Sequence, residues 1–278
     1  MMKIFVLASG RSGTKFLSGL FKYNVKSCTS KHEPAIPEMF GKPTYWYQNG
    51  ETDKIRDLFL IKRDRINRCK TDVYIETNHA FLKSFSDVAI EFFPDMKLIH
   101  LVRNPYKVAR SELNRESWIN DGPVKVIFPT YRYYKASDGK KYFRWALTGN
   151  EDIFKEVKLK QITPYQKYVV QWVEIENRAI NFLDKYKKND DCFTLSVPKE
   201  LNDPKVLKKM FKFFDLELKE ENIVIKGDEN KIRIATVVSD KDEEEFKQVV
   251  NALPDKYLKI FRKEPYTRFE WTNLLKKK

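Results

Sequence analysis

The stretch "FVLASGRSGTKFL", residues 5–17, joins a compact apolar run to a glycine-containing turn and then to a helical pattern. The apolar run suits a strand buried on both faces of a parallel sheet. In a strand–turn–helix unit, free backbone N–H groups and the helix dipole converge on one place, which favours a bound anion. Gly10 and Gly13 allow the chain to turn and to approach a ligand closely, while Arg11 and Lys15 add positive charge. The stretch therefore predicts a phosphate-binding loop.

The order of residues in this loop differs from that of an ATP-binding loop, G-x-x-x-x-G-K-[ST]. With Gly13 as the second glycine, the first falls on Ala8, and Thr14 and Lys15 stand in reversed order. The hydroxyl that holds Mg²⁺ in an ATP site is thus missing from its usual place. A kinase that uses Mg-ATP is disfavoured but is the nearest alternative, with Glu76 as its candidate metal ligand.

The rest of the chain alternates apolar runs with helical patterns. Runs like the first occur at residues 73–77, 97–102 and 192–197, and helical patterns cover residues 14–23, 85–93, 105–116, 166–186 and a segment from 203 onward. This alternation predicts an α/β fold, a parallel β-sheet flanked by helices, as one domain over residues 1–278. Residues 117–162, rich in aromatic and basic side chains, break the rhythm and predict an insert or lid. A surface hairpin is the plainer interpretation of the same segment.

Composition sets broad limits. Of 278 residues, 42% are hydrophobic and 14% aromatic, which is typical of a globular protein, and the net charge of +14 favours an anionic partner without choosing one. Three scattered cysteines, Cys28, Cys69 and Cys192, are expected to be reduced thiols. No signal-peptide pattern and no run of 18 apolar residues is seen, so we expect a cytoplasmic protein without an integral membrane segment.

Two motifs together carry a family resemblance. "RSGTKF", residues 11–16, resembles the 5′-phosphosulfate-binding loop of the PAPS-dependent sulfotransferases, [KR]-[ST]-G-[ST]-[ST] followed by an aromatic or aliphatic residue. "LIHLVRNPYKVARSELNR", residues 98–115, offers Arg103 after an apolar run and Ser111 eight residues later, as in the family's 3′-phosphate site. Weaker sequence similarity to this family extends from residue 2 to about residue 218, except for residues 117–162, which are unmatched. At Lys15 the family usually has Ser or Thr, so Lys15 either contacts the 5′-phosphate or points outward.

The resemblance implies the P-loop nucleoside-kinase-like sulfotransferase fold and a specific chemistry. The donor would be 3′-phosphoadenosine 5′-phosphosulfate (PAPS), and the sulfuryl group would pass to a hydroxyl or amine of a small molecule, carbohydrate or glycolipid. A sulfuryl group carries less negative charge than a phosphoryl group, so oriented N–H groups and cations can suffice without a metal. Arg11 would stabilise the leaving phosphate. The cofactor-binding residues so implied are Arg11, Ser12, Gly13, Thr14, Lys15, Phe16, Arg103 and Ser111.

The resemblance also requires a general base near the acceptor. "SKHEPAIPEMF", residues 30–40, is expected to follow the second strand and to face the loop across the carboxyl edge of the sheet. Several branches of the family have their catalytic Glu in this region, which makes Glu33 the first choice, with Glu38 and His32 behind it. His79, after the strand at 73–77, is the rival base.

Two other functions stay open besides the kinase. A basic nucleic-acid-binding protein without catalysis would account for the charge and for the aromatic-basic insert. A pseudoenzyme would bind the nucleotide without turnover. For the sulfotransferase we expect no nucleic-acid partner and leave the acceptor and the oligomeric state undetermined. Residues 226–238 are a candidate segment for closing over the nucleotide.

Overall fold

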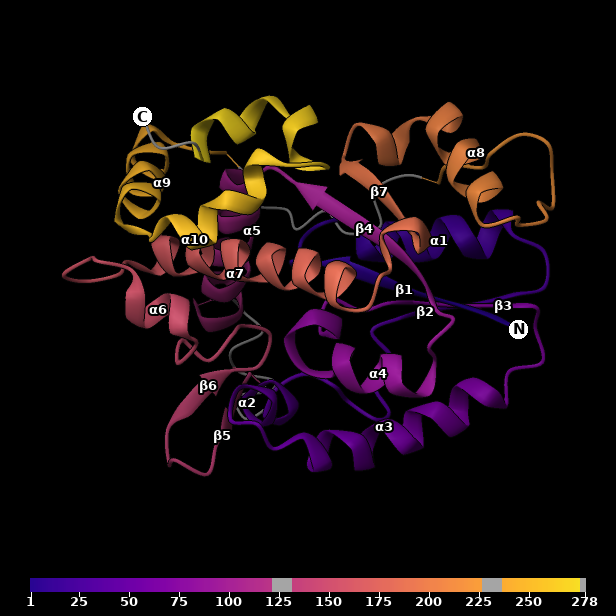
Figure 1. The fold of residues 1–278 in the computed structure, drawn as a ribbon, viewed down its shortest axis with the longest axis horizontal. Coiled ribbons are helices and arrows are strands. Elements are labelled where there is room, and N and C mark those ends of the chain that lie inside the picture. Colours follow the sequence, from indigo (N-terminus) through magenta and orange to yellow (C-terminus); the bar gives the residue numbers. More distant parts are fainter. Residues whose placement is uncertain (122–131, 227–236, 276–278) are drawn as a thin grey trace.

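The computed structural model describes residues 1–121, 132–226 and 237–275, and its centre is a five-stranded parallel sheet (Figure 1). The strand order is β2-β3-β1-β4-β7, and every neighbouring pair is parallel. The strands are β1 Met2–Ala8, β2 Cys28–His32, β3 Val73–Thr77, β4 Lys97–Arg103 and β7 Cys192–Val197. The predicted fold class, a parallel sheet flanked by helices, is therefore confirmed.

Helices cover both faces of the sheet, and the alternation of side chains along β1 decides which layer each residue joins. Ile4 and Val6 pack with α1 and α8 in one layer, whereas Phe5 and Leu7 face α3, α4 and α7 in the other. Because both faces are covered, the buried side chains of the central strands are mostly apolar, with Glu76, Thr77 and His100 as polar exceptions. The α-helices are α1 Thr14–Asn24, α2 Lys42–Gln48, α3 Thr52–Asn67, α4 Ser86–Phe92, α5 Pro105–Asp121, α6 Asp152–Glu156, α7 Pro164–Lys185, α8 Pro204–Phe213, α9 Asp240–Ala252 and α10 Asp255–Leu258.

Short helices of other pitch complete the chain. A fully buried π-helical turn, Phe81–Phe85, leads directly into α4. The 3₁₀ turns are Asn189–Asp191, Glu200–Asn202, Lys259–Arg262, Tyr266–Arg268 and Glu270–Leu275. Of the helices in the described part of the chain, none combines the length and the apolar character needed to cross a membrane.

The segment predicted as an insert forms a small antiparallel hairpin, β5 Tyr133–Lys135 with β6 Lys141–Phe143, followed by α6. Tyr45 of α2 joins the hairpin's Tyr134 and Tyr142 in a separate aromatic cluster. Residues 122–131 of this segment lie outside the described residues, and its function as a lid stays a prediction.

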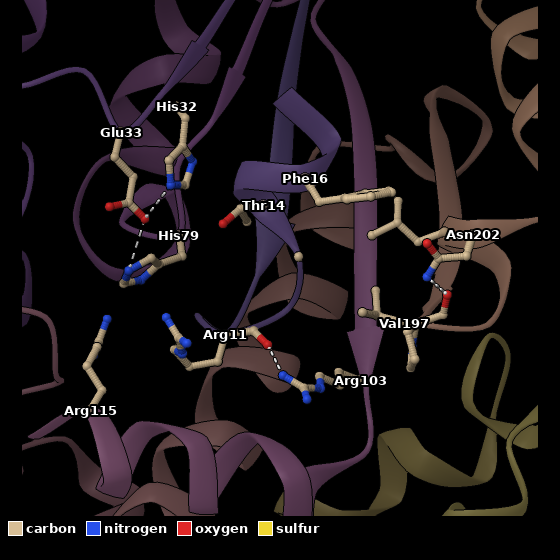
Figure 2. Close-up of a pocket in the computed structure, with 13 residues that line it drawn as sticks. Arg11, Thr14, Phe16, His32, Glu33, His79, Arg103, Arg115, Val197 and Asn202 are labelled. Atoms are coloured by element: carbon tan, nitrogen blue, oxygen red, sulfur yellow. Dashed lines mark hydrogen bonds and ion pairs between the residues drawn. The ribbon is translucent and has the colours of Figure 1, made fainter. Parts of the chain in front are cut away.

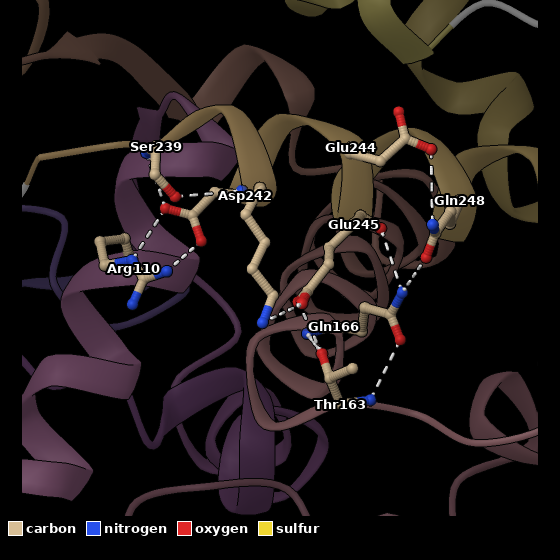
Figure 3. A network of polar contacts seen from close by, with 9 residues as sticks. Arg110, Thr163, Gln166, Ser239, Asp242, Glu244, Glu245 and Gln248 are labelled. Carbon is tan, nitrogen blue, oxygen red and sulfur yellow. Dashed lines mark hydrogen bonds and ion pairs between the residues drawn. The ribbon is translucent and has the colours of Figure 1, made fainter.

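Helix α9 is attached where α5 and α7 meet (Figure 3). Arg110 of α5 donates two hydrogen bonds to the carboxylate of Asp242, a residue that also belongs to a capping box with Ser239. Thr163, the N-cap of α7, donates to Glu245 at 2.7 Å. The C-terminal part of the chain is thus tied to the residue directly before Ser111. Most of the candidate closing segment, 227–236, lies outside the described residues.

Candidate active site

A cavity of about 350 Å³ opens where the chain leaves the carboxyl ends of β1, β2, β3, β4 and β7 (Figure 2). Parallel strands end at a common edge, so the turns that follow them meet there. The loop after β1 contributes Arg11, Gly13 and Thr14, and the turn after β2 contributes Glu33. The remaining strands and α5 add His79, Arg103, Arg115 and the segment from Val197 to Asn202.

The loop between β1 and α1 requires its two glycines. Gly10 and Gly13 have φ angles of 55° and 82°, which side chains disfavour. A Cβ atom on Gly10 would lie 2.3 Å from Oε1 of Glu112, and one on Gly13 would lie 2.7 Å from Cδ2 of Leu201. Gly13 is the N-cap of α1 and carries no side-chain cap, so the first N–H groups of this helix are left for a ligand at the cavity.

Arg11, Arg103 and Ser111 come together beside this loop, although about 100 residues separate Arg11 from Ser111. Nε of Arg11 donates to Oγ of Ser111 at 3.1 Å, and Nη1 of Arg103 donates to the carbonyl of Arg11. Nε of Arg103 is buried and makes no hydrogen bond within the described residues. Burial lowers the pKa of Arg103, and the charge of Arg11 lowers it further. An anion bound here would satisfy a buried donor and relieve the repulsion between two cations.

Glu33 lies at the other end of the cavity. Its Oε1 is 3.3 Å from Nε2 of His79 and 3.8 Å from Nε2 of His32. Burial raises the pKa of Glu33 to about 7, although the positive charges of Arg115 and Lys83 oppose this shift. A carboxylate whose pKa lies near neutrality is suited to accept a proton at physiological pH.

His79 is buried between Phe40 and Lys83. Its ring lies 4.6 Å from that of Phe40, and its Nδ1 is 3.2 Å from Nζ of Lys83. Burial lowers the pKa of His79 well below its ordinary value, and the charges of Lys83 and Arg115 lower it further. His79 is therefore neutral at physiological pH.

The backbone is strained at both ends of the cavity. Arg11 and Glu33 have φ angles of 55° and 44°, in the left-handed region that residues other than glycine rarely adopt. Such conformations cost on the order of 1–3 kcal/mol each and concentrate at functional sites.

The other predicted residues divide into two groups. Thr14 and Phe16 line the cavity, whereas Ser12 turns its hydroxyl back to the carbonyl of Gly10 at 3.2 Å and stabilises the loop. Lys15 and Glu38 are not among the described residues that line the cavity. Glu38 instead forms an ion pair with Arg144.

Glu76, the candidate metal ligand of a kinase, lies inside the core. It is fully buried, its Oε1 is 2.8 Å from Nζ of Lys62, and it accepts hydrogen bonds from Tyr74 and Asn78. With both oxygens engaged by these partners, Glu76 balances a buried lysine, which is a structural function.

Two charged residues of the site, and the cavity wall from Val197 to Asn202, were not predicted. Arg115 lines the cavity and forms an ion pair with Glu112 at 2.5 Å. It lies four residues after Ser111, on the same face of a helix, so helical spacing from that motif residue could have identified it. Lys83 follows His79 by four residues and lies in the π-helical turn Phe81–Phe85, which has no recognised sequence pattern.

The raised pKa of Glu33 leads to a stability prediction. The folded protein keeps this proton up to about pH 7, whereas the unfolded chain loses it near pH 4.5, so ionisation of Glu33 lowers the free energy of unfolding as the pH rises between these values. Because Glu33→Gln removes the ionisation, this variant should be more stable than the wild type at pH 8, by roughly 1–3 kcal/mol. At pH 4 the difference should nearly vanish. Thermal unfolding at both pH values measures it, with Glu38→Gln as control, and an equal difference at the two pH values would contradict the assignment.

Three solved structures are similar to this fold. The sulfotransferase domain from the curacin biosynthetic pathway is 16% identical, with 98% of this chain and 95% of that chain covered and a TM-score of 0.48. Mouse sulfotransferase SULT7A1, crystallised with PAP, is 17% identical, with 99% and 88% covered and a TM-score of 0.45. A sulfotransferase from Alicyclobacillus acidocaldarius is 13% identical, with 89% and 90% covered and a TM-score of 0.47.

No protein-family model matches the chain, and no curated protein matches it in sequence. All three similar structures are sulfotransferases, the family that residues 11–16 and the pair Arg103 and Ser111 resemble in sequence. At identities of 13–17% such likenesses concern the arrangement of helices and strands, and the chemistry depends on the residues of the cavity.

Proposed function

We propose that this protein is a sulfotransferase that transfers the sulfuryl group of PAPS to a hydroxyl or amine of a small-molecule or glycan acceptor. One observation carries the proposal. A single cavity is lined by a phosphate-binding loop, by Arg103 and by a carboxyl group whose pKa is about 7, and Ser111 adjoins it through its hydrogen bond with Arg11. A doubly phosphorylated nucleotide next to an acceptor needs these three elements together.

The residues of the cavity fit such a donor. The uncapped first turn of α1 and the side chain of Arg11 offer donors for the 5′-phosphosulfate. Arg103, whose buried Nε has no hydrogen-bond partner among the described residues, and the hydroxyl of Ser111 offer donors for the 3′-phosphate. Thr14 and Phe16 also line the cavity, whereas Lys15 is not one of the described residues that line it.

The chain's own residues divide the chemistry between them. PAPS supplies an activated sulfuryl group whose transfer builds negative charge on the leaving phosphate, and Arg11 is placed to stabilise that charge. Glu33 takes the proton of the acceptor hydroxyl or amine as the new S–O or S–N bond forms. His79 is neutral and engaged on both sides, so it orients Glu33 and does not compete with it for the proton.

Ligand-dependent thermal unfolding tests this proposal. Adenosine 3′,5′-bisphosphate, the product of PAPS after transfer, should stabilise the protein in the presence of EDTA, by about 2.7 kcal/mol at 100 times its Kd. Mg-ATP at equal concentration should stabilise it much less, because it lacks the 3′-phosphate that Arg103 and Ser111 would bind. Stabilisation by Mg-ATP alone would support a kinase and overturn the proposal.

A further inference from the structure

Lys83 is a buried lysine that the proposed chemistry leaves without a function. It lies in the π-helical turn Phe81–Phe85 and is 0% exposed. Its Nζ donates to the carbonyl of Trp145 at 2.6 Å and is 3.2 Å from Nδ1 of His79. Burying an ammonium group is costly, so each of its contacts matters to the energy of this site.

The contact with Lys83 decides which nitrogen of His79 carries the proton. A lysine ammonium can only donate hydrogen bonds, so Nδ1 of His79 has to accept. In a neutral imidazole the proton then lies on Nε2, the nitrogen 3.3 Å from Oε1 of Glu33. His79 is therefore an N–H donor toward the carboxyl group of Glu33.

His32, on the other side of Glu33, has the opposite arrangement. Its Nδ1 is 2.9 Å from the carbonyl oxygen of Thr77, which only accepts, so Nδ1 carries the proton in the neutral ring. Nε2 of His32, 3.8 Å from the same Oε1 of Glu33, is then the nitrogen with the lone pair. Glu33 lies between one histidine that donates and one that can accept.

We propose that Lys83 is a positioning residue that holds His79 in the Nε2–H tautomer, so that His79 orients Glu33 and the proton-accepting function belongs to Glu33 alone. The tautomer follows from the geometry whatever the reaction is, and only its catalytic consequence rests on the proposed sulfotransferase function. We call the contact by which Lys83 fixes the tautomer of His79 the tautomer lock. The hydrogen bond from Lys83 to the carbonyl of Trp145 also connects this lock to the segment that follows the β5–β6 hairpin.

The charges around Lys83 keep it protonated at neutral pH. Burial lowers its pKa to about 8, with Glu112 and Glu33 raising the pKa and Arg115 and Arg178 lowering it. The lock therefore operates at pH 7. It should weaken at pH values well above 8, where the amine can accept a hydrogen bond from Nδ1.

Nitrogen NMR of the imidazole rings tests the lock in the ligand-free protein. The sequence has only three histidines, so His32→Gln and His100→Gln assign the spectrum by elimination. At pH 7 we expect Nδ1 of His79 at the chemical shift of an unprotonated ring nitrogen and Nε2 at that of a protonated one, with the reverse for His32. A protonated Nδ1 in the wild-type His79 overturns the proposal, whether or not any variant folds.

Variants then separate Lys83 from Glu33, which both favour the same tautomer. In Glu33→Leu no side-chain acceptor remains at this position, and Lys83 alone should keep His79 fully in the Nε2–H form. Adding Lys83→Met should populate the Nδ1–H form, whereas adding Lys62→Met, which removes another buried lysine, should not. An unchanged tautomer in Glu33→Leu with Lys83→Met would contradict the assignment.

Nucleotide binding distinguishes this inference from the proposed function. Lys83→Met should leave the Kd of adenosine 3′,5′-bisphosphate within about threefold of the wild-type value, because Lys83 contacts none of the proposed phosphate-binding groups. A wild-type protein that shows the predicted tautomer but fails to bind the bisphosphate would refute the sulfotransferase and leave the lock intact.

Discussion

Replacing Glu33 with Gln should lower kcat on the order of 10²–10⁴-fold, the range expected when a general base is removed. Gln keeps the size of the side chain and can still accept the hydrogen bond from His79, but it cannot take a proton. Because Glu33 makes no part of the proposed phosphate sites, the Kd of adenosine 3′,5′-bisphosphate should stay nearly unchanged. Radiolabelled PAPS with a cell lysate as the source of acceptors measures the turnover.

Glu38→Gln is the matched control for this variant, since Glu38 lies in the same stretch but pairs with Arg144. In the wild type the rate should rise with pH as Glu33 ionises, with an apparent pKa near 7 set by the burial of the carboxyl group. Turnover by Glu33→Gln at the wild-type rate would transfer the base function to another group, with His32 the next candidate.

Replacing Arg103 with Ala should weaken the binding of adenosine 3′,5′-bisphosphate on the order of 100-fold, or by about 2–3 kcal/mol. The guanidinium would lose its hydrogen bonds to the 3′-phosphate, and the loop would lose the bond that Arg103 donates to the carbonyl of Arg11. Isothermal titration calorimetry with the bisphosphate and with adenosine 5′-monophosphate separates the two losses.

The monophosphate lacks the 3′-phosphate, so its Kd should change far less in Arg103→Ala. Arg63→Ala is the control, because Arg63 lies on α3 and pairs with Asp64 away from the cavity. Equal weakening of both nucleotides would mean that Arg103 supports the loop and does not recognise the 3′-phosphate.

The central sheet was predictable from the sequence because its strands are covered on both faces. The runs at β1, β3, β4 and β7 are largely apolar, and each of them forms a strand. Strand β2, by contrast, consists of Cys28, Thr29, Ser30, Lys31 and His32, and it lies at the edge of the sheet, where pairing and not burial holds it. Its position could be expected only from the family resemblance.

Helix α3 shows why some elements escaped prediction. It is rich in charged residues, and of its 16 residues only Ile55, Phe59, Lys62 and Ile66 are buried. One of these four is a lysine, paired with Glu76, which interrupts the apolar stripe that marks an amphipathic helix. The ion pair depends on a partner from another element, and such a partner is not visible in local sequence.

Site residues that belong to a short sequence motif could be predicted, whereas those that are placed only by tertiary contacts could not. The loop, Arg103 and Ser111 follow from short patterns, and the structure brings Arg11, Arg103 and Ser111 into contact. The sequence ranks Glu33 before His79 only through the family resemblance, because the burial of these groups and the position of the His79 proton are not visible in it. Lys83 determines which nitrogen of His79 carries the proton, and it lies in a π-helical turn, which has no recognised sequence pattern.

A crystal structure with adenosine 3′,5′-bisphosphate tests the central claim most directly. The account predicts the 3′-phosphate within hydrogen-bond distance of Arg103 and Ser111, and the 5′-phosphate against the backbone N–H groups at the start of α1. It also predicts that Glu33 faces the side of the cavity left open beyond the 5′-phosphate. A bisphosphate bound with its 3′-phosphate at the loop, or bound elsewhere on the protein, would contradict it.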